Sequence, residues 1–187
     1  DLRIAADGGA RNARVHLQLA PHIVIGDFDS VDADTLQWLK DAGAEMIYYP
    51  PVKDQTDLEL AIDLAQTRGA DAITILAALG GRPDQMLANV LLLTRSPRVR
   101  IADAQSEMWL AENETEITGD VGDTVSLIPL SASVEGIQTV GLKYPLNRET
   151  LGLGTTRGVS NELIAPRAQV QVESGMLLVI HLFALSP

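Results

Sequence analysis

The chain has 187 residues, and its 25 Asp and Glu residues against 14 Lys and Arg residues give a net charge of -11. This balance argues against a nucleic-acid partner, because clustered Lys and Arg drive binding to a phosphate backbone. No apolar run approaches the roughly 20 residues of a membrane-spanning helix, so no membrane partner is expected. The absence of Cys excludes disulfides and favours a cytoplasmic protein.

Short apolar runs alternate with helical patterns over the first 104 residues. The runs lie at residues 2–6, 23–25, 46–49, 72–76 and 99–102. Apolar side chains recur at helical spacing over residues 56–68 and from about residue 84, and Ser30, Asp32 and Asp34 precede a third helix that Gly43 closes. This alternation predicts an α/β domain with a mostly parallel, Rossmann-like sheet and flanking helices.

The helical period disappears after residue 104. Strand-like runs follow one another at residues 125–129, 134–140, 168–172 and 176–182, with glycine-containing turns between them. This pattern predicts a small all-β sandwich. We therefore expect two domains, residues 1–104 and residues 105–187. One continuous α+β domain is a second interpretation, because about 80 residues can also bury a face against the first half.

Two carboxylates directly follow the predicted strand at residues 23–25. Asp27 and Asp29 stand two residues apart, so both side chains point the same way in an extended strand end. Close carboxylates repel each other unless a cation lies between them, and hard oxygen ligands suit Mg²⁺. Considered alone, the pair is explained equally well as a turn residue and a helix cap.

Three more turns after predicted strands carry acidic, basic or glycine residues: Ala6-Asp7-Gly8-Gly9-Ala10, Lys53-Asp54-Gln55-Thr56-Asp57 and Gly80-Gly81-Arg82-Pro83-Asp84-Gln85. Each alone has a simpler interpretation, because acids favour helix N-termini and glycine pairs are common in turns. Open α/β sheets, however, bind ligands at the carboxyl ends of their strands. The four turns together therefore predict one Mg²⁺-assisted site for a phosphorylated ligand, with Lys53 and Arg82 beside the phosphates.

These segments, with two from the second half, strongly resemble those of the thiamine pyrophosphokinase family. The second-half segments are Gly141-Leu142-Lys143-Tyr144-Pro145-Leu146 and Gly158-Val159-Ser160-Asn161-Glu162. The resemblance implies transfer of diphosphate from ATP to the hydroxyl of thiamine, giving thiamine diphosphate and AMP. It also implies a homodimer with thiamine bound at the subunit interface, and one more strand before the point where this chain begins.

The same resemblance implies roles for the matched residues. Mg²⁺ ligands would be Asp27, Asp29 and Asp57. Further catalytic carboxylates would be Asp54 and Asp84. Contacts to ATP would come from Asp7, Gly8, Gly9, Ser30, Lys53, Gln55, Thr56 and Arg82. Thiamine would be held by Ser160 and Asn161. Any of Asp54, Asp57 and Asp84 is a candidate for the base.

Other functions are compatible with the residues. Another Mg²⁺-dependent transferase, such as a pterin diphosphokinase, or a phosphatase would use the same acidic pair and release other products. A non-catalytic thiamine or nucleotide binder would show no turnover. His16, His22 and His181 are distant from the acidic segments in the sequence, and we interpret them as ordinary surface or packing residues.

Overall fold

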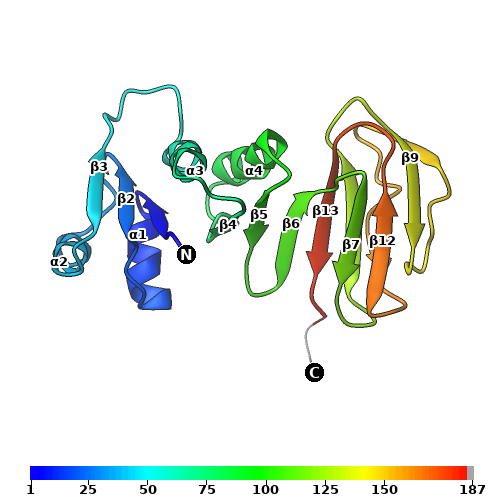
Figure 1. Cartoon of the computed structure of the whole chain (residues 1–187), viewed down its shortest axis with the longest axis horizontal. Helices are drawn as coiled ribbons and strands as arrows, with labels where there is room; N and C mark the ends of the chain where they lie inside the picture. The colour runs from blue at the N-terminus through cyan, green and yellow to red at the C-terminus, as the bar shows by residue number, and fades with distance from the viewer. Residues whose placement is uncertain (185–187) are drawn as a thin grey trace. The chain divides into compact units, whose positions relative to one another are not determined.

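The computed structural model describes residues 1–184 (Figure 1). Contacts divide the chain into two compact units, Asp1–Ile73 and Thr74–Pro187. Across residues 1–184, every helix is too short or too polar to cross a membrane.

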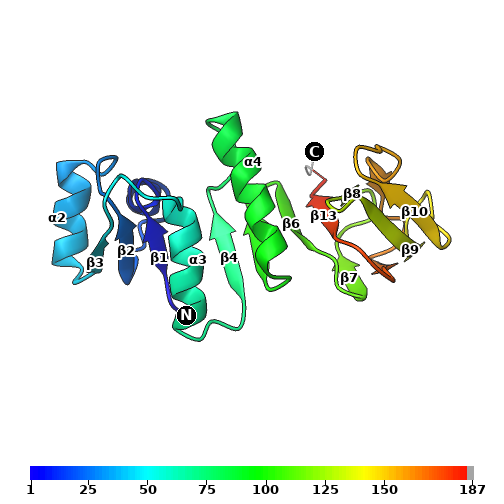
Figure 2. The ribbon, with the colours of Figure 1, turned by 90° about the horizontal axis from the view of Figure 1, so that it is seen from above.

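The first unit contains a three-stranded parallel sheet of β1 (Ile4–Ala6), β2 (Ile23–Gly26) and β3 (Glu45–Tyr48), with β2 in the middle. Its helices are α1 (Gly9–Asn12), the π-helix η1 (Ala13–Leu17), α2 (Ala33–Asp41) and α3 (Asp57–Thr67). Every residue of β2 is buried. Val24 packs in one cluster with Leu39 of α2, and Ile25 packs in another with Leu60 of α3. Helices therefore cover both faces of β2 (Figure 2), which explains its uninterrupted apolar sequence.

The second unit combines two helices with two sheets. Its helices are α4 (Pro83–Leu92) and the 3-10 helix η2 (Leu93–Arg95). The first strands are β4 (Ile73–Leu76), β5 (Val99–Ala102), β6 (Ser106–Leu110), β7 (Glu114–Thr118) and β8 (Thr124–Pro129). The others are β9 (Ser133–Val140), β10 (Glu149–Gly152), β11 (Asn161–Glu162), β12 (Arg167–Gln171) and β13 (Leu177–Leu182).

These strands form a six-stranded sheet, β11-β8-β13-β6-β5-β4, and a four-stranded sheet, β10-β9-β12-β7. Leu127 and Val179 of the larger sheet share one buried core with Ile117, Ile137 and Val170 of the smaller one. The β-rich second part is therefore present as expected. The prediction of a mostly parallel sheet is wrong for the larger sheet, because its four pairings from β11 to β5 are antiparallel.

A hairpin turn occupies the predicted domain boundary. Strands β5 and β6 pair Ala102 with Glu107, and a carboxylate oxygen of Asp103 accepts hydrogen bonds from the backbone N–H groups of Gln105 and Ser106, at 2.8 Å each. Contacts divide the chain earlier, after Ile73. The boundary between residues 104 and 105 thus stays a prediction.

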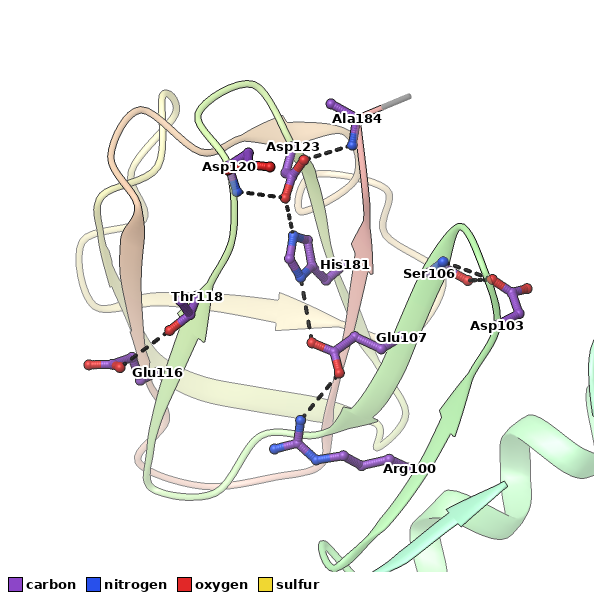
Figure 3. A network of polar contacts seen from close by, with 10 residues as sticks. All are labelled: Arg100, Asp103, Ser106, Glu107, Glu116, Thr118, Asp120, Asp123, His181 and Ala184. Atoms are coloured by element: carbon purple, nitrogen blue, oxygen red, sulfur yellow. Dashed lines mark hydrogen bonds and ion pairs between the residues drawn. The ribbon is translucent and has the colours of Figure 1, made fainter. Parts of the chain in front are cut away.

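His181 is a buried member of a network of polar contacts (Figure 3). Only 1% of this residue is exposed. Its Nε2 lies 2.7 Å from an Asp123 oxygen, and its Nδ1 lies 3.6 Å from a Glu107 oxygen. Arg100 pairs with the other Glu107 oxygen at 3.4 Å. Burial opposes ionisation of Asp123, but hydrogen bonds from the Ala184 N–H and the His181 ring hold the pKa of this carboxyl below its ordinary value.

Candidate active site

The carboxyl ends of β1 and β2 bring two acidic segments together. In the parallel register Ala6 lies opposite Ile25, and the N–H of Asp7 donates to the Ile25 carbonyl at 2.9 Å. Asp7 and Asp27 therefore leave neighbouring strands at the same edge of the sheet. Carboxylate oxygens of Asp7, Asp27 and Asp29 all lie within 4.8 Å of one another.

The turn after β2 differs from the extended strand end that the sequence predicts. Phe28 has φ +64°, which is the left-handed region and is unusual for a bulky residue. This bend lets the Asp29 N–H donate to the Asp27 carboxylate at 3.2 Å. The two carboxylates are near each other as expected, but a left-handed turn rather than strand alternation brings them together.

The donor set of this cluster fits a hard divalent cation. Three carboxylates in this space repel one another, and a bound cation relieves the repulsion. One oxygen of Asp7 is buried and has no hydrogen-bond partner within residues 1–184. Such an atom is costly without a partner, so a cation ligand is the simplest account of it. Mg²⁺ suits oxygen donors of this kind.

Asp57 lies close to this cluster, beside Gly26 at the end of β2. A Cβ atom added to Gly26 would be 3.0 Å from the Asp7 Cβ and 3.3 Å from the Asp57 Cγ. Lys53 Nζ is 3.1 Å from an Asp57 oxygen and also donates to the Pro50 carbonyl at 3.2 Å. The structure thus groups Asp7, rather than Asp57, with Asp27 and Asp29, and pairs Asp57 with a lysine.

Other residues of the predicted ATP site have local roles in the first unit. Thr56 is the N-cap of α3, and its hydroxyl accepts from the Glu59 N–H at 3.2 Å. Gln55 donates to Asp63 at 3.0 Å. Ser30 donates to Asp29 at 2.9 Å. Gly8 lies near Ser30 and Gly9 begins α1, whereas Asp54 is exposed at the end of the loop before α3.

Arg82 and Asp84 lie in the second unit, at the start of α4. They form an ion pair, in which Arg82 Nε lies 3.1 Å from an Asp84 oxygen. The hydrogen bonds from Arg82 hold the pKa of Asp84 at about 2. Asp84 is therefore ionised near neutral pH, and both side chains are exposed.

Ser160 and Asn161, the predicted thiamine residues, adjoin each other but differ in exposure. Ser160 is exposed in a left-handed turn with φ +59°, and its N–H donates to the Ser126 hydroxyl at 3.0 Å. Asn161 is buried in β11, and its side chain bonds to the backbone of Tyr144. The sequence pattern carried no signal for this last contact, because the two residues are 17 positions apart.

Comparison with known proteins places these observations in one family. The family model "Thiamin pyrophosphokinase, catalytic domain" matches residues 1–103, and "Thiamin pyrophosphokinase, vitamin B1 binding domain" matches residues 113–177. Thiamine pyrophosphokinase of Bacillus subtilis is 34% identical over 169 residues, covering 87% of this chain and 79% of that protein. Thiamine pyrophosphokinase 1 of Oryza sativa is 26% identical over 208 residues, covering 97% and 79%.

Solved structures agree with this placement. The crystal structure of the Bacillus subtilis thiamine pyrophosphokinase has a TM-score of 0.88 at 32% identity, covering 98% of this chain and 88% of that one. That from Geobacillus thermodenitrificans has a TM-score of 0.84 at 28% identity, covering 98% and 86%. Fold and sequence thus define a transferase of diphosphoryl groups. The chain belongs to the thiamine pyrophosphokinase family, which forms thiamine diphosphate and AMP from thiamine and ATP.

Proposed function

We propose that Asp7, Asp27 and Asp29 form the Mg²⁺ site at which this chain transfers diphosphate from ATP to thiamine. The observation that supports this assignment is the grouping of their three carboxylates at the ends of β1 and β2. Asp57 would complete the site when Lys53 releases it. The lysine would then be free to offset the charge of a phosphate group.

The proposed chemistry asks the side chains mainly to position groups and balance charge. Bound Mg²⁺ would neutralise charge on the phosphate oxygens. The thiamine hydroxyl oxygen would form a bond to the β-phosphorus of ATP while the bond from that phosphorus to the AMP oxygen breaks. One of Asp54, Asp57 and Asp84 would accept the hydroxyl proton. We also propose Arg82 as a contact to the phosphates of ATP.

The proposal also covers the site of the acceptor substrate, the oligomeric state of the protein and its location in the cell. We assign thiamine to the turn that contains Ser160 and Asn161, within the segment that matches a vitamin B1 binding domain. By resemblance to the family, we also propose a homodimer that works in the cytoplasm.

Product analysis tests the reaction directly. The wild-type chain should release AMP from ATP only when thiamine is present, with one thiamine diphosphate formed per AMP. Asp27→Asn and Asp29→Asn should each lower kcat by at least about 100-fold, since each removes a carboxylate ligand. Asp71→Asn is the matched control, because this aspartate is exposed in the loop after α3 and should retain full activity.

Two results would contradict the proposal. Thiamine-independent release of inorganic phosphate would indicate a phosphatase instead. Near-normal activity of Asp29→Asn at saturating Mg²⁺ would contradict the metal site. Titration calorimetry with Mn²⁺ supplies a readout independent of turnover, and Asp29→Asn should bind Mn²⁺ more weakly than Asp71→Asn does.

A further inference from the structure

We propose that Asn161 is a positioning residue, which fixes the backbone of Tyr144 so that the exposed tyrosine ring meets the acceptor substrate. This inference rests on the proposed function, because it assumes that thiamine binds near residues 158–162. It assigns Asn161 a different task from direct contact with the substrate.

Backbone groups occupy three of the four hydrogen-bonding positions of the Asn161 side chain. Its Oδ1 accepts from the Tyr144 N–H at 2.9 Å and from the Glu162 N–H at 2.9 Å. Its Nδ2 donates to the Tyr144 carbonyl at 2.7 Å. Both lone pairs of the amide oxygen are therefore in use. With only 7% of the residue exposed, this oxygen has no acceptor capacity left for a ligand.

The segment that Asn161 holds is an exposed arch between two buried leucines. Leu142 is 2% exposed and Leu146 is 3% exposed, whereas Tyr144 between them is 60% exposed. The arch begins at Gly141, which has φ +83° and no space for a side chain, since an added Cβ would lie 2.5 Å from the Arg167 carbonyl oxygen. Asn161 binds both polar backbone groups of Tyr144, so it fixes the centre of the arch.

The arch is tied to β11 along its length. The Lys143 N–H donates to the Glu162 carbonyl at 3.0 Å, and the two side chains form an ion pair at 2.8 Å. Lys143 Nζ lies 6.0 Å from the centre of the Tyr144 ring. Because Glu162 offsets the lysine charge, the ring can still attract a cationic ligand.

Tyr144 is the aromatic side chain best placed for such a ligand in the β-rich part. Trp109 is 3% exposed and has Arg100 over its ring at 4.7 Å. Phe183 packs edge-on against His181, with ring centres 5.0 Å apart. Tyr144 lies beside the Ser160–Asn161 turn through the Asn161 contacts. An aromatic face attracts a cation, and the thiazolium ring of thiamine is one.

Steady-state kinetics of thiamine-dependent AMP release test the proposal. Asn161→Ala should raise the KM for thiamine about tenfold, because the two hydrogen bonds that hold Tyr144 in the arch are lost. The KM for ATP should change less than about twofold. Tyr144→Ala should raise the KM for thiamine by a similar factor, and Tyr144→Phe should preserve it. Asn113→Ala, an exposed asparagine before β7, is the matched control and should match the wild type.

The double variant separates positioning from direct contact. If Asn161 acts through Tyr144, Asn161→Ala should add little to the KM of Tyr144→Ala. If the increases in KM of the two single variants instead multiply in the double variant, the proposal is overturned, and Asn161 contacts thiamine itself. A Tyr144→Ala variant with a wild-type KM would also overturn it, and this variant leaves the Asn161 side chain in place should Asn161→Ala fail to fold.

Amide hydrogen exchange gives a readout that does not depend on turnover. The Tyr144 N–H should exchange faster in Asn161→Ala than in the wild type, whereas the Ala111 N–H, which donates to the Leu177 carbonyl at 2.8 Å, should not change. Equal exchange at Tyr144 would overturn the positioning role. A wild-type chain without thiamine-dependent AMP release would instead contradict the proposed function, so the two failures are distinguishable.

Discussion

Gly26 sets the spacing of the acidic side chains at the end of β2. It has φ +146°, a conformation that residues with a side chain rarely adopt. A Cβ atom here would lie 3.0 Å from the Asp7 Cβ and 3.3 Å from the Asp57 Cγ. The smallest possible side chain would therefore strain the backbone and displace both aspartate side chains.

Gly26→Ala should accordingly reduce both stability and activity. We expect a loss of about 1–3 kcal/mol in the free energy of unfolding, typical of a residue forced into a disfavoured backbone conformation. Urea unfolding followed by circular dichroism measures it. Gly9→Ala is the control for stability, because nothing lies within 4 Å of its added Cβ. Equal unfolding curves for the two variants would contradict this account of Gly26.

Asp123 should make the stability of the β-rich part depend on pH. Its carboxyl has a pKa below the unfolded value of about 3.9, so its stabilising effect is present above that value and is lost as pH falls through the folded pKa. Asp123→Asn should therefore lower the midpoint of urea unfolding at pH 7. The difference from the wild type should shrink below about pH 4. A difference that is the same at pH 3 and pH 7 would count against this linkage.

The sequence predicted that Asp27 and Asp29 lie close together, but it did not predict the backbone conformation that brings them together. Asp27 and Asp29 were expected near each other, and they are. The cause is the left-handed Phe28, and no residue-type pattern signals that conformation in phenylalanine. Asp7 joined the cluster through the register of β1 on β2. Register depends on how two strands pair, so the sequence of one segment alone does not predict it.

At the scale of elements, local sequence patterns were enough to predict a strand or a helix where its apolar residues follow a regular spacing. The predicted strand at residues 23–25 is β2, and the predicted helix at residues 56–68 is α3. The strand β6 was missed because Ser106 and Glu107 open it with polar side chains. Polar partners satisfy these two side chains. Asp103 accepts hydrogen bonds from Ser106 in the adjoining turn, and Glu107 pairs with Arg100 of β5 and with His181 of the distant β13. Without β6, the antiparallel hairpin with β5 was not foreseeable.

The start of α3 offers a prediction about one element. Thr56 and Glu59 have the spacing of a capping box, and the Thr56 hydroxyl accepts from the Glu59 N–H. Thr56→Ala should cost about 1 kcal/mol of stability, whereas Thr56→Ser should retain most of it. Urea unfolding of the two variants measures the difference. Because α3 begins with Asp57, loss of activity in Thr56→Ala with normal activity in Thr56→Ser would link the cap to the position of that carboxylate.

At the scale of the whole molecule, part of the net charge of -11 is concentrated in the cluster of Asp7, Asp27 and Asp29. A cation that binds only the folded state stabilises it by mass action. Mg²⁺ should therefore raise the melting temperature of the wild type by several degrees. The same concentration should have a smaller effect on Asp29→Asn, with Asp71→Asn as the control. An equal shift in all three proteins would assign the effect to general screening of negative charge.

The position of the domain boundary is the remaining question at this scale, and a fragment comparison answers it. A fragment of residues 74–187 keeps β5, whose Val99 and Ile101 are fully buried and whose Arg100 lies over Trp109. A fragment of residues 105–187 loses this strand and exposes the edge of β6. We expect the longer fragment to unfold cooperatively and the shorter one to be less stable by several kcal/mol, because two large buried side chains and a strand pairing are removed. Equal urea midpoints would instead favour the boundary after residue 104, which the sequence pattern predicts. That boundary lies between the two family matches, of which the first ends at residue 103 and the second begins at residue 113.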